Sequence, residues 1–75
     1  MAVEPGAGDV VVHKRDVARR PRFDVTVLGS PEQYSIRTYE RALNRADSFA
    51  RHARVDVWYT EDGAHFRLIT RRRTG

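Results

Sequence analysis

Three arginines fall at a spacing of four residues in the middle of this sequence. Arg37, Arg41 and Arg45 share the polar side of a helix predicted to begin at Tyr39. Like charges at this spacing repel at a cost of roughly 0.2–0.5 kcal/mol, and an anionic partner would remove that cost. A solvated helix face is the alternative. We expect these three side chains to bind an anion.

Two further basic segments flank this region. The stretch HKRDVARRPR precedes Phe23, and an arginine run ends the chain. Clusters of this kind bind phosphate backbones without sequence preference and with strong salt dependence. They also act as solubilising ends or prevent edge strands from pairing. The residues assigned to anion binding from these segments are Arg19, Arg20, Arg71, Arg72 and Arg73.

Residues for catalysis or metal binding are few. The histidines His13, His52 and His65 fall on different predicted elements, and there is no cysteine to ligate zinc. The sequence has no glycine-rich phosphate loop and no serine at a nucleophile elbow. We therefore predict a non-enzymatic protein without a metal or another cofactor.

Length and charge limit the classes of protein further. Seventy-five residues allow one domain, and a net charge of +4 with a pI near 10.3 favours anionic partners. The N-terminus resembles no signal peptide and no stretch is long enough to span a membrane, so we expect a cytoplasmic protein. We expect a flexible N-terminus over residues 1–9, a single domain over 10–73 and a C-terminal end at 74–75.

Two strands are predicted before the helix. Residues 22–29 alternate, with Phe23, Val25 and Val27 on one face, and residues 33–37 follow a turn at 29–31. A short extra strand over Val10 to His13 is also expected. Pro21 is expected to interrupt any regular element in the basic segment.

The helix is predicted from Tyr39 to about Arg54, with the Thr38 hydroxyl as N-cap and Glu40 favourable for the helix dipole. Small residues in its apolar stripe would let it approach a sheet closely. The stripe comprises Tyr39, Ala42, Leu43, Ala46, Phe49, Ala50 and Ala53.

A second hairpin is predicted to turn at Asp62-Gly63, a pair typical of type I′ turns. A two-residue loop pairs Tyr59 with Phe66, Val57 with Leu68 and Trp58 with Arg67, which keeps apolar partners on one face. This register predicts an exposed sheet face opposite the helix that carries Trp58, Arg67, Ile69 and His65.

The predicted fold is α+β, with strand order ββαββ and one helix on one face of a four-stranded sheet. It resembles the β-grasp arrangement, in which the first and last strands lie parallel at the sheet centre. The stretch TYERALNRADSFARHARVDVWYTEDG is also similar to small uncharacterised bacterial proteins with two strand pairs around a helix. Packing and turn residues carry this resemblance, and it implies the fold alone: Ala42, Ala46, Ala50, Asp62 and Gly63.

The functional prediction is a small non-catalytic binding module for an anionic partner, with nucleic acid preferred over an acidic protein surface. Trp58 beside Arg67 could stack bases on the open sheet face. Alternatively, the N-terminal segment or a second copy of the chain covers that face. The second hypothesis is therefore a protein-interaction or regulatory module, with a homodimer through the Trp58 face.

Overall fold

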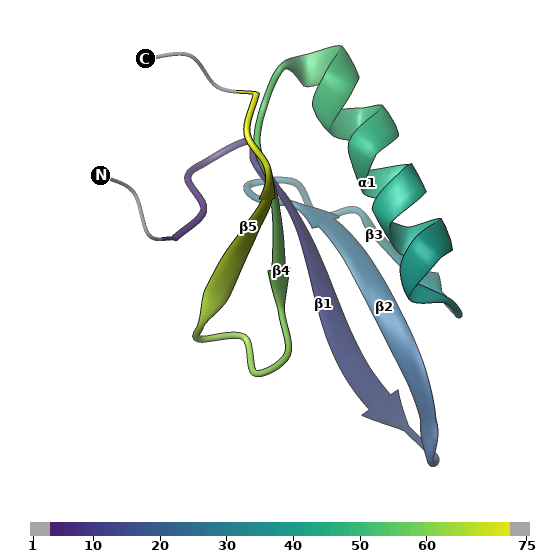
Figure 1. Cartoon of the computed structure of the whole chain (residues 1–75). Helices are drawn as coiled ribbons and strands as arrows, with labels where there is room; N and C mark the ends of the chain where they lie inside the picture. The colour runs from purple at the N-terminus through teal and green to yellow at the C-terminus, as the bar shows by residue number, and fades with distance from the viewer. Residues whose placement is uncertain (1–3, 73–75) are drawn as a thin grey trace.

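The computed structural model describes residues 4–72, in which one helix packs on a five-stranded mixed sheet (Figure 1). The sheet order is β3-β2-β1-β4-β5; β1 and β4 are parallel and the other neighbours are antiparallel. The elements are β1 Val10–Val17, β2 Arg20–Val27, β3 Gln33–Ile36, α1 Tyr39–Ala53, β4 Val57–Thr60 and β5 Phe66–Thr70. The predicted α+β class, with strand pairs before and after one helix, is confirmed, and the sheet has five strands rather than four.

The extra N-terminal strand is longer than predicted. It continues beyond His13 to Val17 and forms a hairpin with β2 that extends past the other strands (Figure 1). Ala18 and Arg19 both have positive φ, as a two-residue hairpin turn requires. The predicted interruption at Pro21 is wrong, because Pro21 lies in β2 opposite Asp16. The β2–β3 pairing covers only residues 23–26 of β2, so the missing N–H of proline breaks no ladder bond to β3.

This strand also changes the centre of the sheet. The β-grasp resemblance predicts that the first and last strands are parallel neighbours, but β5 lies at an edge and pairs only with β4. The parallel central pair is β1 and β4, with Val10 opposite Val57 and Val12 opposite Tyr59. The valine-rich start of β1 takes the central position because it can bury side chains on both faces.

The helix forms as predicted. The Thr38 hydroxyl accepts from the Arg41 N–H at 3.2 Å, and the left-handed Arg54 ends α1 by donating its N–H to the Ala50 carbonyl. The alanines at 42, 46 and 50 are fully buried against β1 and β2, which lets the helix axis lie close to the sheet. Ala53, predicted to be in the same stripe, is exposed at the last helical residue.

The predicted two-residue register of the final hairpin is wrong. The structure pairs Trp58 with Leu68, Tyr59 with Arg67 and Thr60 with Phe66, which leaves a five-residue loop over 61–65 and a bulge between Val57 and Trp58. The physical reason lies at Asp62, whose Oδ1 accepts from the N–H groups of Ala64 and His65, each at 2.8 Å. Only Gly63 of the turn pair has positive φ, so a type I′ turn does not form.

The sheet face opposite the helix is covered near its centre by the chain itself. Trp58 is only 3% exposed, and its Nε1 donates to Asp9 Oδ2 at 3.1 Å. Backbone hydrogen bonds between the segment at Gly8 and Asp9 and Leu28 hold the chain before β1 along β2. Part of the segment predicted to be flexible therefore contributes to the fold. Over residues 4–72, no helix has the length and apolar character needed to cross a membrane.

Candidate anion-binding groove

A groove lies between the edge strand β3 and α1, and arginines dominate its lining. Its volume is about 660 Å³. It contains all three of the arginines predicted from their spacing of four, together with Arg22 from β2. The lining residues are Arg22, Ser35, Ile36, Arg37, Arg41, Asn44, Arg45 and Ser48. We call this site the arginine groove.

The local folding of three elements brings these side chains together. Phe23 pairs with Ile36, so the neighbouring Arg22 and Arg37 lie close to each other at the ends of β2 and β3. Arg41 and Arg45 are one helical turn apart, about 6 Å along the axis. The groove is therefore walled by two strands on one side and by the first half of α1 on the other.

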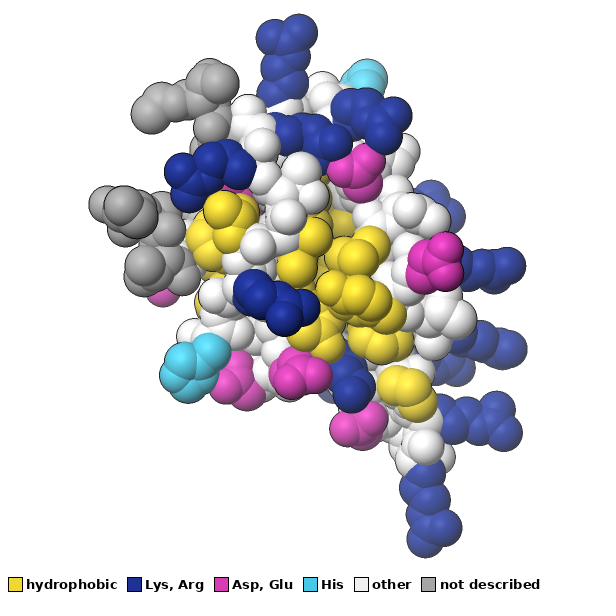
Figure 2. All heavy atoms as spheres, viewed as in Figure 1, with side chains coloured by type: hydrophobic (Ala, Val, Ile, Leu, Met, Phe, Trp, Pro, Cys, Tyr) yellow, Lys and Arg dark blue, Asp and Glu magenta, His cyan; other side chains and the backbone are white. Residues whose placement is uncertain are grey.

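The side chains that line the groove carry positive charge and no negative charge. No carboxylate lines it, and across residues 4–72 none of its four arginines makes an ion pair. Figure 2 shows Lys and Arg side chains projecting in a row on the side of the molecule where α1 lies. Since the lining carries four positive charges, the groove would attract an anion.

Arg45 is positioned by an aromatic contact at the β3 side. Its guanidinium carbon lies 5.6 Å from the centre of the Tyr34 ring, and that ring stacks on Phe49 at 5.5 Å. The Tyr34 hydroxyl donates to Glu32 Oε2 at 3.1 Å, and this hydrogen bond raises the pKa of the tyrosine. The stacked rings thus hold the Arg45 guanidinium at the β3 side of the groove, and the Glu32 carboxylate is bound to the hydroxyl of the same tyrosine.

The groove has the chemistry of a binding site for an oxyanion. A guanidinium presents five N–H donors in a planar fork that matches phosphate and carboxylate oxygens. Ser35, Asn44 and Ser48 add neutral hydrogen-bonding groups along the groove. In the part of the chain that the structure describes, no group of three or more His, Asp or Glu side chains is arranged to hold a metal ion.

Arg19, Arg20, Arg71 and Arg72 do not line the groove. Arg19 and Arg20 are exposed at the tip of the β1–β2 hairpin, and Arg71 is exposed beyond β5. Arg73 lies outside the described residues. Arg72 Nη2 lies 2.7 Å from Asp47 Oδ1, so this arginine is paired with an acid of the same chain, and its role in anion binding stays a prediction.

The predicted exposed face around Trp58 does not form. Trp58 is buried, and the observed register of β5 places Arg67 and Ile69 on the helix side, where Arg67 lies 5.4 Å from the centre of the Tyr59 ring. His65 is in the loop before β5 rather than on the sheet. The predicted base-stacking pair of Trp58 and Arg67 is therefore divided between opposite faces.

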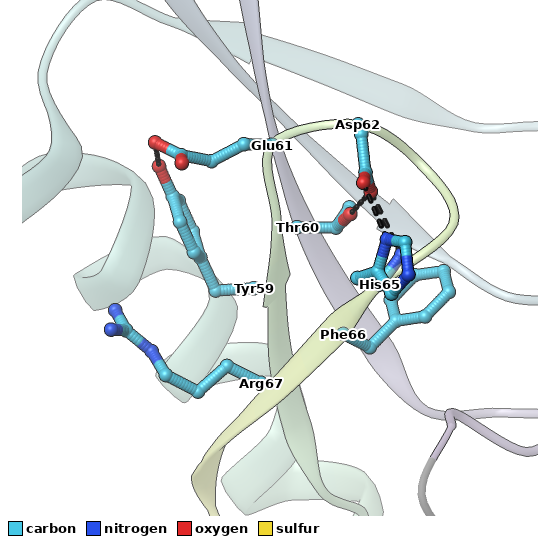
Figure 3. A pocket seen from close by; sticks show the side chains of 7 residues that line it. All are labelled: Tyr59, Thr60, Glu61, Asp62, His65, Phe66 and Arg67. Carbon is cyan, nitrogen blue, oxygen red and sulfur yellow. Dashed lines mark hydrogen bonds and ion pairs between the residues drawn. The ribbon is translucent and has the colours of Figure 1, made fainter.

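A smaller pocket of about 270 Å³ lies at the β4–β5 loop (Figure 3). Its main polar contact joins Asp62 Oδ2 and His65 Nδ1 at 2.6 Å. Hydrogen bonds from the His65 backbone and ring hold the pKa of Asp62 well below its usual range, and Asp62 in turn raises the pKa of His65. Glu61 points away from this pair toward the Tyr59 hydroxyl (Figure 3). These side chains hold the loop in shape.

Comparisons of the chain with protein-family models, with curated proteins and with solved structures give no match. The predicted resemblance to small bacterial proteins therefore stays a prediction. Arg22 is the groove arginine that was not assigned to anion binding, although it ends the basic segment HKRDVARRPR; the neutral lining residues Ser35, Ile36, Asn44 and Ser48 were not predicted either. The position of Arg22 before the alternating β2 residues was visible, but its proximity to Arg37 depends on the β2–β3 register.

Proposed function

We propose that this protein is a small non-catalytic module that binds the phosphate backbone of nucleic acid through the arginine groove. The observation that carries the proposal is a groove lined by four arginines and no carboxylate. Guanidinium forks on a helix and a strand edge suit a flexible anionic chain that contributes several phosphates in succession. The modest net charge of +4 means that the local arrangement, rather than the total charge, provides the attraction.

The alternative of a homodimer through the face opposite the helix has less support. Trp58, its predicted anchor, is covered by the chain's own Asp9 segment. An acidic protein surface remains the competing partner for the arginine groove, because carboxylates fit the same guanidinium forks.

The proposal is tested by fluorescence anisotropy with a labelled single-stranded oligonucleotide. At about 50 mM salt, the double variant R41Q/R45Q should bind roughly 50-fold more weakly than the unmodified protein, because two phosphate contacts are lost. The matched control is R51Q/R54Q, which removes the same charge from the last turn of the helix and its cap. The control should retain affinity within about threefold, because neither residue lines the groove and neither would contact a phosphate there.

Equal loss of affinity in the two variants would contradict a specific role for the groove. Competition with polyglutamate, run in parallel, distinguishes the two classes of partner. If polyglutamate displaces the oligonucleotide at equal charge concentration, the groove is a general polyanion site and the preference for nucleic acid is wrong.

A further inference from the structure

A further pocket, distinct from the arginine groove and from the β4–β5 loop pocket, lies near the first turn of α1. Aromatic rings from β2, α1 and β4 meet there. Its volume is about 270 Å³, and its lining residues are Lys14, Phe23, Tyr39, Tyr59, Glu61 and Arg67. The rings form a chain in which Phe23 and Tyr39 are 5.7 Å apart and Tyr39 and Tyr59 are 5.2 Å apart. We call this site the aromatic pocket.

The aromatic pocket is open because the helix does not cover the whole sheet. α1 packs chiefly on β1 and β2, so the β4–β5 side of this face is left with partly exposed apolar side chains. Tyr39 is 36% exposed, although its ring is part of the aromatic chain. Figure 2 shows hydrophobic side chains gathered between α1 and the β4–β5 hairpin, with charged side chains around them.

The rim of the pocket provides both hydrogen-bond donors and acceptors. Lys14 Nζ lies 3.9 Å from Glu61 Oε2, and the Arg67 guanidinium lies over the Tyr59 ring. The Tyr59 hydroxyl donates to Glu61 Oε2 at 3.1 Å, and partial burial raises the pKa of that tyrosine. Two cations, one carboxylate and a phenol at the edge of an aromatic site suit a planar ligand with a polar edge.

The two sites share one end of the helix. Tyr39 lies between Arg37 and Arg41 in the sequence, and Phe23 directly follows Arg22. A strand would pass from these arginines to the rings around the first turn of α1, because the groove lies on the β3 side of the helix and the aromatic pocket lies on the β4 side. Proteins that bind single-stranded nucleic acid combine these two features, a positive groove for the backbone and aromatic side chains for the bases.

We propose that the aromatic pocket binds a nucleobase of the strand whose phosphates occupy the arginine groove, with Tyr39 as the main stacking residue. This inference rests on the proposed function and adds the type of nucleic acid, because only a single strand can offer an unpaired base. The volume accommodates a single planar ring system, and the mixed polar rim favours no particular base.

The test compares a short oligothymidine with an abasic strand of the same length, which retains the phosphates and lacks the bases. The unmodified protein should bind the oligothymidine about tenfold more tightly than the abasic strand. Tyr39→Ala should remove this preference and leave affinity for the abasic strand unchanged. Tyr39→Phe should preserve it, because the ring is retained and the hydroxyl is not needed for stacking.

The possible results distinguish failure of base binding in the aromatic pocket from failure of phosphate binding in the arginine groove. Equal affinity of the unmodified protein for both strands, or an equal loss for both in Tyr39→Ala, would overturn the proposal. If neither strand binds, the groove proposal fails, and the pocket is then tested with adenosine, which carries no phosphate. Shifts of the Tyr39 and Tyr59 ring signals in NMR spectra on addition of adenosine would support the pocket, and unchanged signals would refute it. Thermal unfolding of each variant, followed by circular dichroism, verifies that it is folded.

Discussion

The two halves of α1 both carry arginines, but only in the second half does an arginine of the helix pair with an acid among residues 4–72. In the second half, Asp47 accepts from Arg51 at 2.8 Å and contacts Arg72 at 2.7 Å. In the first half, Arg41 and Arg45 face a groove whose lining contains no carboxylate. Arginine therefore stabilises the fold through ion pairs at the C-terminal end of the helix. At the N-terminal end it is available to bind a partner. The position of a single aspartate makes this difference.

Placing an acid in the groove should make the first half of the helix resemble the second half, and it should have the largest effect on oligonucleotide affinity. Asn44→Asp keeps the shape of the side chain and gives the groove a carboxylate one turn from Arg41. Affinity for a single-stranded oligonucleotide should fall roughly tenfold at about 50 mM salt, the equivalent of one lost phosphate contact. Asn44→Gln is the neutral control. Unchanged anisotropy titrations for Asn44→Asp would mean that the ligand does not enter the groove.

A smaller effect, on stability rather than on binding, is expected when Asp47 is removed from the second half of the helix. Asp47→Asn leaves Arg51 and Arg72 without their shared partner and should lower the free energy of unfolding by about 0.5 kcal/mol at neutral pH. Affinity for the oligonucleotide should change by less than about threefold, because Asp47 does not line the groove and contacts no phosphate there. Urea unfolding at neutral pH measures the first effect and anisotropy measures the second.

The pH dependence of the same variant sharpens the result. Hydrogen bonds from Arg51 and then Arg72 lower the pKa of Asp47, so its contribution is present above the usual carboxyl pKa, near pH 4. That contribution is lost as the pH falls through the lowered value. The stability difference between the unmodified protein and Asp47→Asn should therefore shrink in acid. A difference that stays constant down to about pH 2 would show that the ion pairs contribute nothing.

Local patterns in the sequence predicted the elements that are held by local chemistry. The alternation of Phe23, Val25 and Val27 identified β2, and the Thr38 cap with the buried alanines identified α1. The spacing of Arg41 and Arg45 likewise predicted that they share one helix face, because such a face depends only on the helical period; Arg37 lies before the N-cap and reaches the groove from the end of β3.

Features that depend on distant partners were not predictable in the same way. The polar second half of β1 forms a strand because β2 pairs with it, although residues after His13 bury little. The final hairpin takes another register because one Asp62 oxygen satisfies several loop donors. Trp58 is buried, and its indole N–H is satisfied by Asp9, which is 49 residues away in the sequence.

The most direct test of the central claim is the salt dependence of oligonucleotide binding by the unmodified protein and by R41Q/R45Q. Four phosphate contacts in the arginine groove predict that a plot of log affinity against log salt has a slope of roughly −3 for a single strand. Loss of two contacts predicts that this slope is about halved in the variant. The same slope in both proteins would contradict the account, because the bound phosphates would then lie elsewhere.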